Sequence, residues 1–121
     1  MNPKPTKKEL DELWAKAVKL RDGNKSVYSG KTDRLNSHHI LHKPNYRLRW
    51  ALDNGITITS GEHRFVAHGG GNRSGDFQEW ALNRLGKKRR KELEGMKYLT
   101  GGVDLWLVRL FLIKKIEEFS T

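Results

Sequence analysis

Four of the chain's five histidines flank a predicted pair of short strands. They are His38, His39, His63 and His68, and Asn54 lies between the two pairs. Neighbouring residues of a β-strand point to opposite faces, so His38 and His39 reach one ligand only if the strand ends or kinks there. One imidazole can bind a metal while its neighbour acts as a base, because neutral imidazole does both near physiological pH. The pair therefore favours separate roles, with one histidine as a metal ligand and the other as a base.

Three segments follow one another in order: Leu35–Ile40 with its two histidines, Leu52–Ile58 with its asparagine, and then His63. Their residues and spacing resemble the His-Asn-His (HNH) signature of the ββα-metal endonucleases. The preceding Leu20–Gly23 is similar to the lead-in of many phage and bacterial members, and the resemblance covers about residues 13 to 80. It implies a small phage-type nuclease that acts on DNA.

The resemblance implies a role for each residue of the set. His38 and His63 match the metal ligands of the family. His39 matches the general base that takes a proton from the attacking water, and Asn54 matches the residue that orients this base. His68 resembles a third ligand less closely, because it follows His63 by five residues instead of four, which is about 140° on a regular helix. The implied cofactor is one divalent ion, Mg²⁺ or Mn²⁺, with Ni²⁺ or Zn²⁺ also compatible with imidazole ligands.

Many relatives also bind a structural zinc through two Cys-x-x-Cys knuckles, whereas this chain has no cysteine. The matching positions are Ser26 and Ser29 in the first knuckle and Thr59 and Glu62 in the second. Neutral hydroxyls are poor zinc ligands, so we expect no structural zinc here.

Each residue of the set also has a structural interpretation. A histidine can serve only as a hydrogen-bonding or surface residue, and Asn54–Gly55 is a favoured turn pair that adopts the left-handed conformation. The loss of the zinc knuckles also favours a second hypothesis, a non-catalytic nucleic-acid-binding module that kept the scaffold. The complete set favours an endonuclease or nickase that hydrolyses phosphodiester bonds.

The net charge of the chain is +10, from 24 Lys and Arg against 14 Asp and Glu. A strongly basic surface attracts phosphate backbones, so the expected partner is DNA. Arg47, Arg49 and Arg64, near the predicted hairpin, could hold a phosphate bidentately. A second basic group is formed by Lys87, Lys88, Arg89 and Arg90. Such a run is usually the solvated face of a helix, and its alternative role is to bind phosphates outside the cut site.

The pattern of expected helices and strands around these residues predicts an α+β fold. We expect a single nuclease domain over residues 1–121, made of an N-terminal helix, a ββα-metal core and a C-terminal helical region, at 6–21, 25–72 and 76–119. Within the core, strands are expected at 35–41 and 56–59, followed by a helix that Ser60 caps.

The helices have recognisable beginnings. Thr6 and Glu9 have the spacing of a capping box, and so have Asp76 and Glu79. The final helix, over residues 103–119, is apolar almost all round in its first three turns, which favours either a central place in the core or a homodimer. No segment is suited to crossing a membrane or directing export, so we expect a cytoplasmic protein, in the host cytoplasm if it is phage-encoded.

Overall fold

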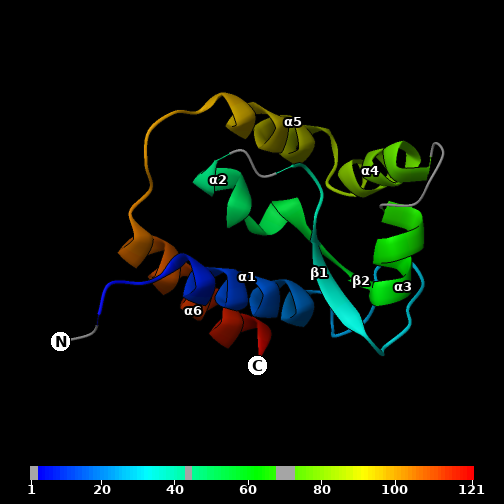
Figure 1. Ribbon diagram of the computed structural model, residues 1–121, viewed down its shortest axis with the longest axis horizontal. Coiled ribbons are helices and arrows are strands. Elements are labelled where there is room, and N and C mark those ends of the chain that lie inside the picture. Colours follow the sequence, from blue (N-terminus) through cyan, green and yellow to red (C-terminus); the bar gives the residue numbers. More distant parts are fainter. Residues whose placement is uncertain (1–2, 43–44, 68–72) are drawn as a thin grey trace.

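A two-stranded antiparallel hairpin runs between two layers of helices (Figure 1). The computed structural model describes residues 3–42, 45–67 and 73–121. The strands are β1 (Leu35–His39) and β2 (Gly55–Thr59), and Leu35 pairs with Thr59 at one end and His39 with Gly55 at the other. Helices and sheet are both present, so the predicted α+β class is confirmed.

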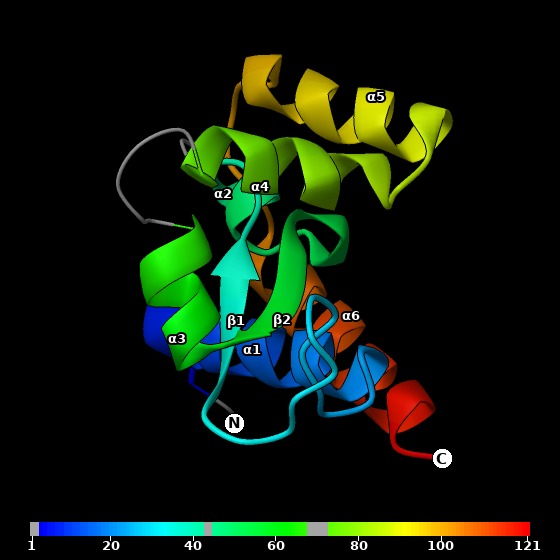
Figure 2. The ribbon, with the colours of Figure 1, turned by 90° about the vertical axis from the view of Figure 1, so that its right-hand side faces the viewer.

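The helices lie on the two sides of this hairpin (Figure 2). On one side are α1 (Lys7–Arg21) and α6 (Leu105–Phe119), and on the other are α4 (Arg73–Asn83) and α5 (Lys87–Gly95). Shorter elements connect them: α2 (Tyr46–Arg49), the 3₁₀ turn η1 (Leu52–Asn54), α3 (Ser60–Glu62), the π-helical segment η2 (His63–Ala67) and the 3₁₀ turn η3 (Met96–Tyr98).

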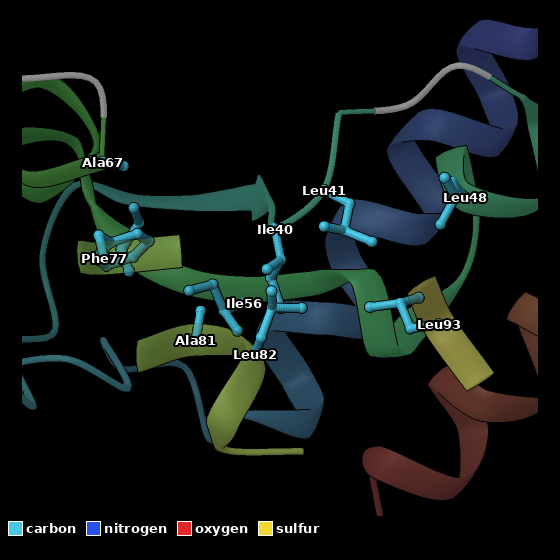
Figure 3. Packing of buried hydrophobic residues seen from close by; sticks show 10 residues of the cluster. Ile40, Leu41, Leu48, Ile56, Ala67, Phe77, Ala81, Leu82 and Leu93 are labelled. Carbon is cyan, nitrogen blue, oxygen red and sulfur yellow. The ribbon is translucent and has the colours of Figure 1, made fainter. Parts of the chain in front are cut away.

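Each face of the hairpin has its own hydrophobic cluster, because side chains alternate along the strands. Ile56 of β2 faces the α4 and α5 side (Figure 3). The other residues of its cluster are Ile40, Leu41, Leu48, Ile58, Ala67, Phe77, Ala81, Leu82 and Leu93. The cluster on the α1 and α6 side consists of Leu10, Trp14, Ala17, Val18, Trp50 and Leu112. The hairpin is therefore covered on both faces.

Helix α1 begins where the sequence indicates, since the Thr6 hydroxyl accepts a hydrogen bond from the Glu9 amide at 3.1 Å. Its buried residues are the predicted stripe of Leu10, Trp14, Ala17 and Val18. The Glu9 carboxylate forms an ion pair with Arg109 of α6, at 3.2 Å. We therefore observe the Thr6 half of the predicted capping box.

The second predicted capping box, Asp76 with Glu79, is wrong. Helix α4 already begins at Arg73, so Asp76 lies inside its first turn, and the Glu79 carboxylate forms an ion pair with Arg90 of α5 at 2.8 Å. A complete box occurs instead at α3, where Thr59, not Ser60, is the N-cap residue and exchanges hydrogen bonds with Glu62.

Helix α6 lies at the edge of the molecule, so the expected central place in the core is wrong. Asp104 caps it by accepting hydrogen bonds from the amides of Trp106 and Leu107, and Leu112 is its buried residue. Four large side chains are exposed on this helix: Trp106, Leu107, Leu110 and Phe111. Within the described part of the chain, no helix is long and apolar enough to cross a membrane.

Candidate active site

His38 and His63 come from different elements and lie side by side. His38 is the fourth residue of β1 and is buried, and His63 begins η2 directly after α3. Their ring centroids are 4.8 Å apart at an interplanar angle of 70°, and the Phe77 ring of α4 lies 5.7 Å from that of His38. The hairpin and the following helical segment thus bring together two imidazoles that are 25 residues apart in the sequence.

The separation of the two ring centroids is close to that of two imidazoles on one ion. With metal–nitrogen bonds of about 2.1 Å, two imidazoles on one ion have centroids roughly 5 Å apart. Within the described ranges there is no group of three or more His, Asp or Glu side chains that could hold a metal. An ion held by His38 and His63 would therefore keep positions open for water and a phosphate oxygen.

Asn36 contacts the His63 ring, a relation that the sequence did not reveal. Its Nδ2 lies 3.3 Å from His63 Nδ1. Nδ2 only donates, so Nδ1 is the acceptor in this contact. Ligation through Nε2 would require a proton on Nδ1 and an Asn36 amide turned to present its oxygen to it. In either arrangement the Asn36 amide orients the His63 ring.

His39 points to the opposite face of the hairpin, as strand alternation requires. Its ring stacks on that of Trp14 in α1, with centroids 4.0 Å apart and an interplanar angle of 6°. Its Nε2 lies 2.9 Å from the backbone oxygen of Arg49. A carbonyl oxygen only accepts hydrogen bonds, so Nε2 carries the proton and the lone pair of the neutral ring is on Nδ1.

Asn54 is completely buried and connects three backbone groups. Its Oδ1 accepts from the Leu41 amide at 2.7 Å, and its Nδ2 donates to the carbonyls of Leu41 and Leu48 at 3.1 and 3.0 Å. The next carbonyl after Leu48 is that of Arg49, which accepts from His39. Asn54 is therefore connected to His39 through the backbone of Leu48 and Arg49 in α2. The hydrogen bonds between Asn54 and the Leu41 backbone also explain why β1 ends at His39 and not at residue 41.

The turn interpretation of Asn54–Gly55 is wrong. Asn54 ends η1, and Gly55 begins β2 with φ −125°, which is not left-handed. The reason for glycine is the close approach of α1, since a Cβ at this position would lie 2.5 Å from Trp14 Cζ2 and 2.7 Å from Val18 Cγ2. Gly55 thus permits the packing that brings Trp14 to His39.

The Arg21–Asp22 pair of the lead-in joins α1 to the hairpin. The Arg21 guanidinium donates to the carbonyls of Leu52 and Gly55, both at 2.7 Å, and pairs with the Asp22 carboxylate at 2.9 Å. Asp22 in turn accepts from the Thr57 amide at 2.9 Å. These contacts fix β2 on α1 and involve no residue of the predicted catalytic set.

The four positions that match the zinc knuckles come together in a hydrogen-bonded cluster. Glu62 Oε1 accepts from the Ser26 hydroxyl at 2.5 Å and from the Thr59 amide at 2.9 Å, and the Ser29 amide donates to the Ser26 hydroxyl at 3.1 Å. Burial opposes ionisation of Glu62, but hydrogen bonds from Ser26, Ser29 and Thr59 outweigh it and hold the pKa of this carboxyl below its usual value. The cluster connects the loop after α1 to the start of α3, directly before His63.

His68, the loosely matching third ligand, lies outside the described residues. The segment that precedes it, His63–Ala67, is π-helical and not a regular α-helix.

Several of the predicted DNA-binding residues have partners within the protein. Arg49 forms a bidentate pair with Asp11, at 2.8 and 2.6 Å, and Arg89 pairs with Asp53. Arg90 is held by Glu79 and Glu94, at 2.8 and 3.0 Å.

The remaining predicted DNA-binding residues differ from these. Arg47 donates to the carbonyls of Thr100 and Gly101, at 3.2 and 3.3 Å. Arg64, Lys87 and Lys88 are exposed, and in the described part of the chain they take part in no ion pair. Contact with DNA stays a prediction for the whole group.

Comparison with known proteins adds no assignment to this geometry: no protein-family model, no curated protein and no solved structure matches the chain.

Proposed function

We propose that the protein is a metal-dependent DNA endonuclease or nickase of the HNH type. The observation that carries the proposal is the placement of three histidines on one hairpin and its following helix. His38 and His63 lie 4.8 Å apart, centroid to centroid, and His39 is oriented by the Arg49 carbonyl. The strand–strand–helix order of β1, β2 and α3 with η2 is the order expected of a ββα-metal core.

In this proposal His39 is the general base. Its Nδ1 takes a proton from water as the water oxygen forms a bond to phosphorus and the bond from phosphorus to the 3′ oxygen breaks. Trp14 and the Arg49 carbonyl keep the ring in place during this transfer. His38 and His63 hold one divalent ion, with His68 as a third ligand; when bound, the ion supplies charge neutralisation at the phosphate and at the leaving oxygen.

The test is cleavage of supercoiled plasmid by the purified protein in Mg²⁺ or Mn²⁺. We expect nicked or linear product that disappears with EDTA, and a rate about 10² to 10⁴ times lower for His39→Ala. His42→Ala, three residues away in the loop after β1, is the matched control and should retain the rate. Equal activity of wild type and His39→Ala would refute the assignment of the base.

A non-catalytic nucleic-acid-binding module is the second candidate. The observation that favours it is that the described residues offer two candidate metal ligands and not a group of three. Salt-dependent DNA binding without cleavage in Mg²⁺, Mn²⁺, Ni²⁺ or Zn²⁺ would select this candidate over the first.

A homodimer through α6 completes the proposed function, since two copies of the site could cut both strands. It is supported by the exposed Trp106, Leu107, Leu110 and Phe111 on that helix. Sedimentation analysis at increasing concentration should show dimerisation, and Leu107→Glu should abolish it. A monomer throughout the range would remove the dimer from the proposal.

A further inference from the structure

A depression of about 340 Å³ lies where the loop before β1 meets α3 and η2. Lys31 and Arg34 come from the loop, and Arg64 and Phe65 come from η2. The Ser60 amide donates to the Arg34 carbonyl at 2.7 Å, which fixes the loop beside the helical segment (Figure 1). The remaining lining residues are Asp33, Thr59, Ser60 and Gly61.

The cations of this depression differ from five arginines that are paired elsewhere in the protein. Arg21, Arg49, Arg89, Arg90 and Arg109 all form ion pairs with carboxylates. Lys31, Arg34 and Arg64 are exposed, and none of them belongs to an ion pair in the part of the chain that the structure describes. Against the single Asp33 they leave a local excess of positive charge, which suits the phosphates of a nucleic-acid strand.

Phe65 adds an aromatic surface to this charge. Its side chain is 62% exposed, which is unusual for a phenyl ring that packing could bury, and the Arg64 guanidinium carbon lies 5.6 Å from the ring centroid. Base stacking on an exposed ring, with cations along the backbone, is the general mode of binding single strands. A paired duplex keeps the faces of its bases stacked on each other, so an exposed phenyl ring selects for an unpaired base.

Arg34 has φ +55°, in the left-handed region that bulky residues avoid. The hydrogen bond from Ser60 holds this conformation and keeps Arg34 beside Arg64 and Phe65. Arg64 also follows His63 directly in the sequence, so one cation of the depression is the chain neighbour of the proposed metal ligand.

We propose that this depression binds a DNA strand next to the cut, with Lys31, Arg34 and Arg64 on its phosphates and Phe65 stacked on an unpaired base. The substrate class is then DNA that is single-stranded, branched or locally opened at the site of cleavage. This inference rests on the proposed endonuclease function and extends it to the form of the substrate.

The test measures binding in EDTA, where no metal-dependent cleavage occurs, by fluorescence anisotropy of a labelled 20-nucleotide strand and of its duplex. Phe65→Ala should weaken single-strand binding roughly 5- to 150-fold, the loss of one stacked base, and leave duplex binding nearly unchanged. Arg64→Ala should lower the slope of log affinity against log salt by about 0.7 for the single strand.

Tyr98→Ala is the matched control, because Tyr98 is also exposed (79%) and also has a cation beside its ring, Lys97 at 5.9 Å. The affinity of the Tyr98→Ala variant for the single strand should equal that of wild type. Equal losses for Phe65→Ala and Tyr98→Ala, equal losses of Phe65→Ala on strand and duplex, or no loss at all would each overturn the inference.

Plasmid nicking in Mn²⁺ separates this inference from the proposed function. If wild type nicks and Phe65→Ala binds the strand like wild type, the inference fails and the endonuclease stands. If Phe65→Ala loses strand binding as expected and wild type cleaves no DNA, the strand site is supported and the endonuclease fails.

Discussion

The two faces of the β1–β2 hairpin hold their histidines in different ways. On the α4 side, the His38 ring contacts the rings of His63 and Phe77, and the side chain of Asn36 contacts His63. On the α1 side, His39 is stacked on Trp14 and hydrogen-bonded to a backbone carbonyl. The first face brings two imidazoles together, and the second fixes a single ring and its tautomer.

This difference explains how two adjacent histidines can have separate tasks. Because side chains alternate along a strand, one of the two imidazoles points away from any ligand that the other binds. Here β1 ends at His39, so this residue is at the end of the strand, where the chain turns toward α2. We infer that the hairpin separates the holding of a metal from the transfer of a proton, and the following predictions test that separation.

The largest effects should come from the histidines themselves. His63→Ala should abolish binding of Mn²⁺ or Ni²⁺ in titration calorimetry. His39→Ala should retain metal affinity and lose about 10² to 10⁴ in cleavage rate. Loss of metal affinity in both variants would show that the two faces do not have separate tasks.

Asn54→Ala should cost about 2–4 kcal/mol of unfolding free energy, because it leaves the buried backbone groups of Leu41 and Leu48 without their partner. Urea denaturation measures this change. Asn83→Ala is the control, since Asn83 is exposed and its hydrogen bond is to Arg90, and it should change stability by about 0.5 kcal/mol or less. Similar losses of unfolding free energy in both variants would contradict the stabilising role of the Asn54 hydrogen bonds.

Asn36→Leu should weaken metal binding about 10- to 100-fold by removing the partner that orients His63. Ser37→Ala changes the neighbouring residue on the other face, where the Ser37 hydroxyl donates to the Ala15 carbonyl at 2.7 Å. It should leave metal affinity unchanged. A metal affinity that falls equally in both would assign the effect to the strand and not to Asn36.

Gly55→Ala should destabilise the protein by about 1–3 kcal/mol, because its methyl group would overlap Trp14 and Val18. Gly75→Ala is the opposite case, since Gly75 lies in α4 with open space around it, and should stabilise by up to about 1 kcal/mol. Thermal denaturation of the two variants compares them directly. A neutral Gly55→Ala would mean that α1 can withdraw from β2 at no cost.

The sequence predicted the elements better than their contacts. The stripe of Leu10, Trp14, Ala17 and Val18 identified α1, and the alternation of residues 56–59 identified β2. The roles of Asn54 and Gly55 were harder to infer. The same two residue types occur in a favoured turn and in a buried segment where the asparagine side chain binds the backbone. Only the partners at Leu41, Leu48 and Trp14 distinguish them.

The site shows the same limit. Asn36 is inside the segment that resembles the family signature, yet its relation to His63 depends on the register of β1 against β2 and on the start of α3. Trp14 fits any amphipathic helix, and no local pattern indicates that its ring lies on that of His39. Arg64 and Arg89 look alike in the sequence, although Arg89 has Asp53 as a partner.

The sequence by itself determined the excess of positive charge, the order of the histidine and asparagine segments, and the period of the first helix and second strand. These features depend on composition and on residues near one another in the chain. The tertiary structure decided which cations are neutralised, which face each histidine occupies and why residue 55 is glycine. Those outcomes depend on side chains that are distant in sequence, whose approach is set by packing on both faces of the hairpin.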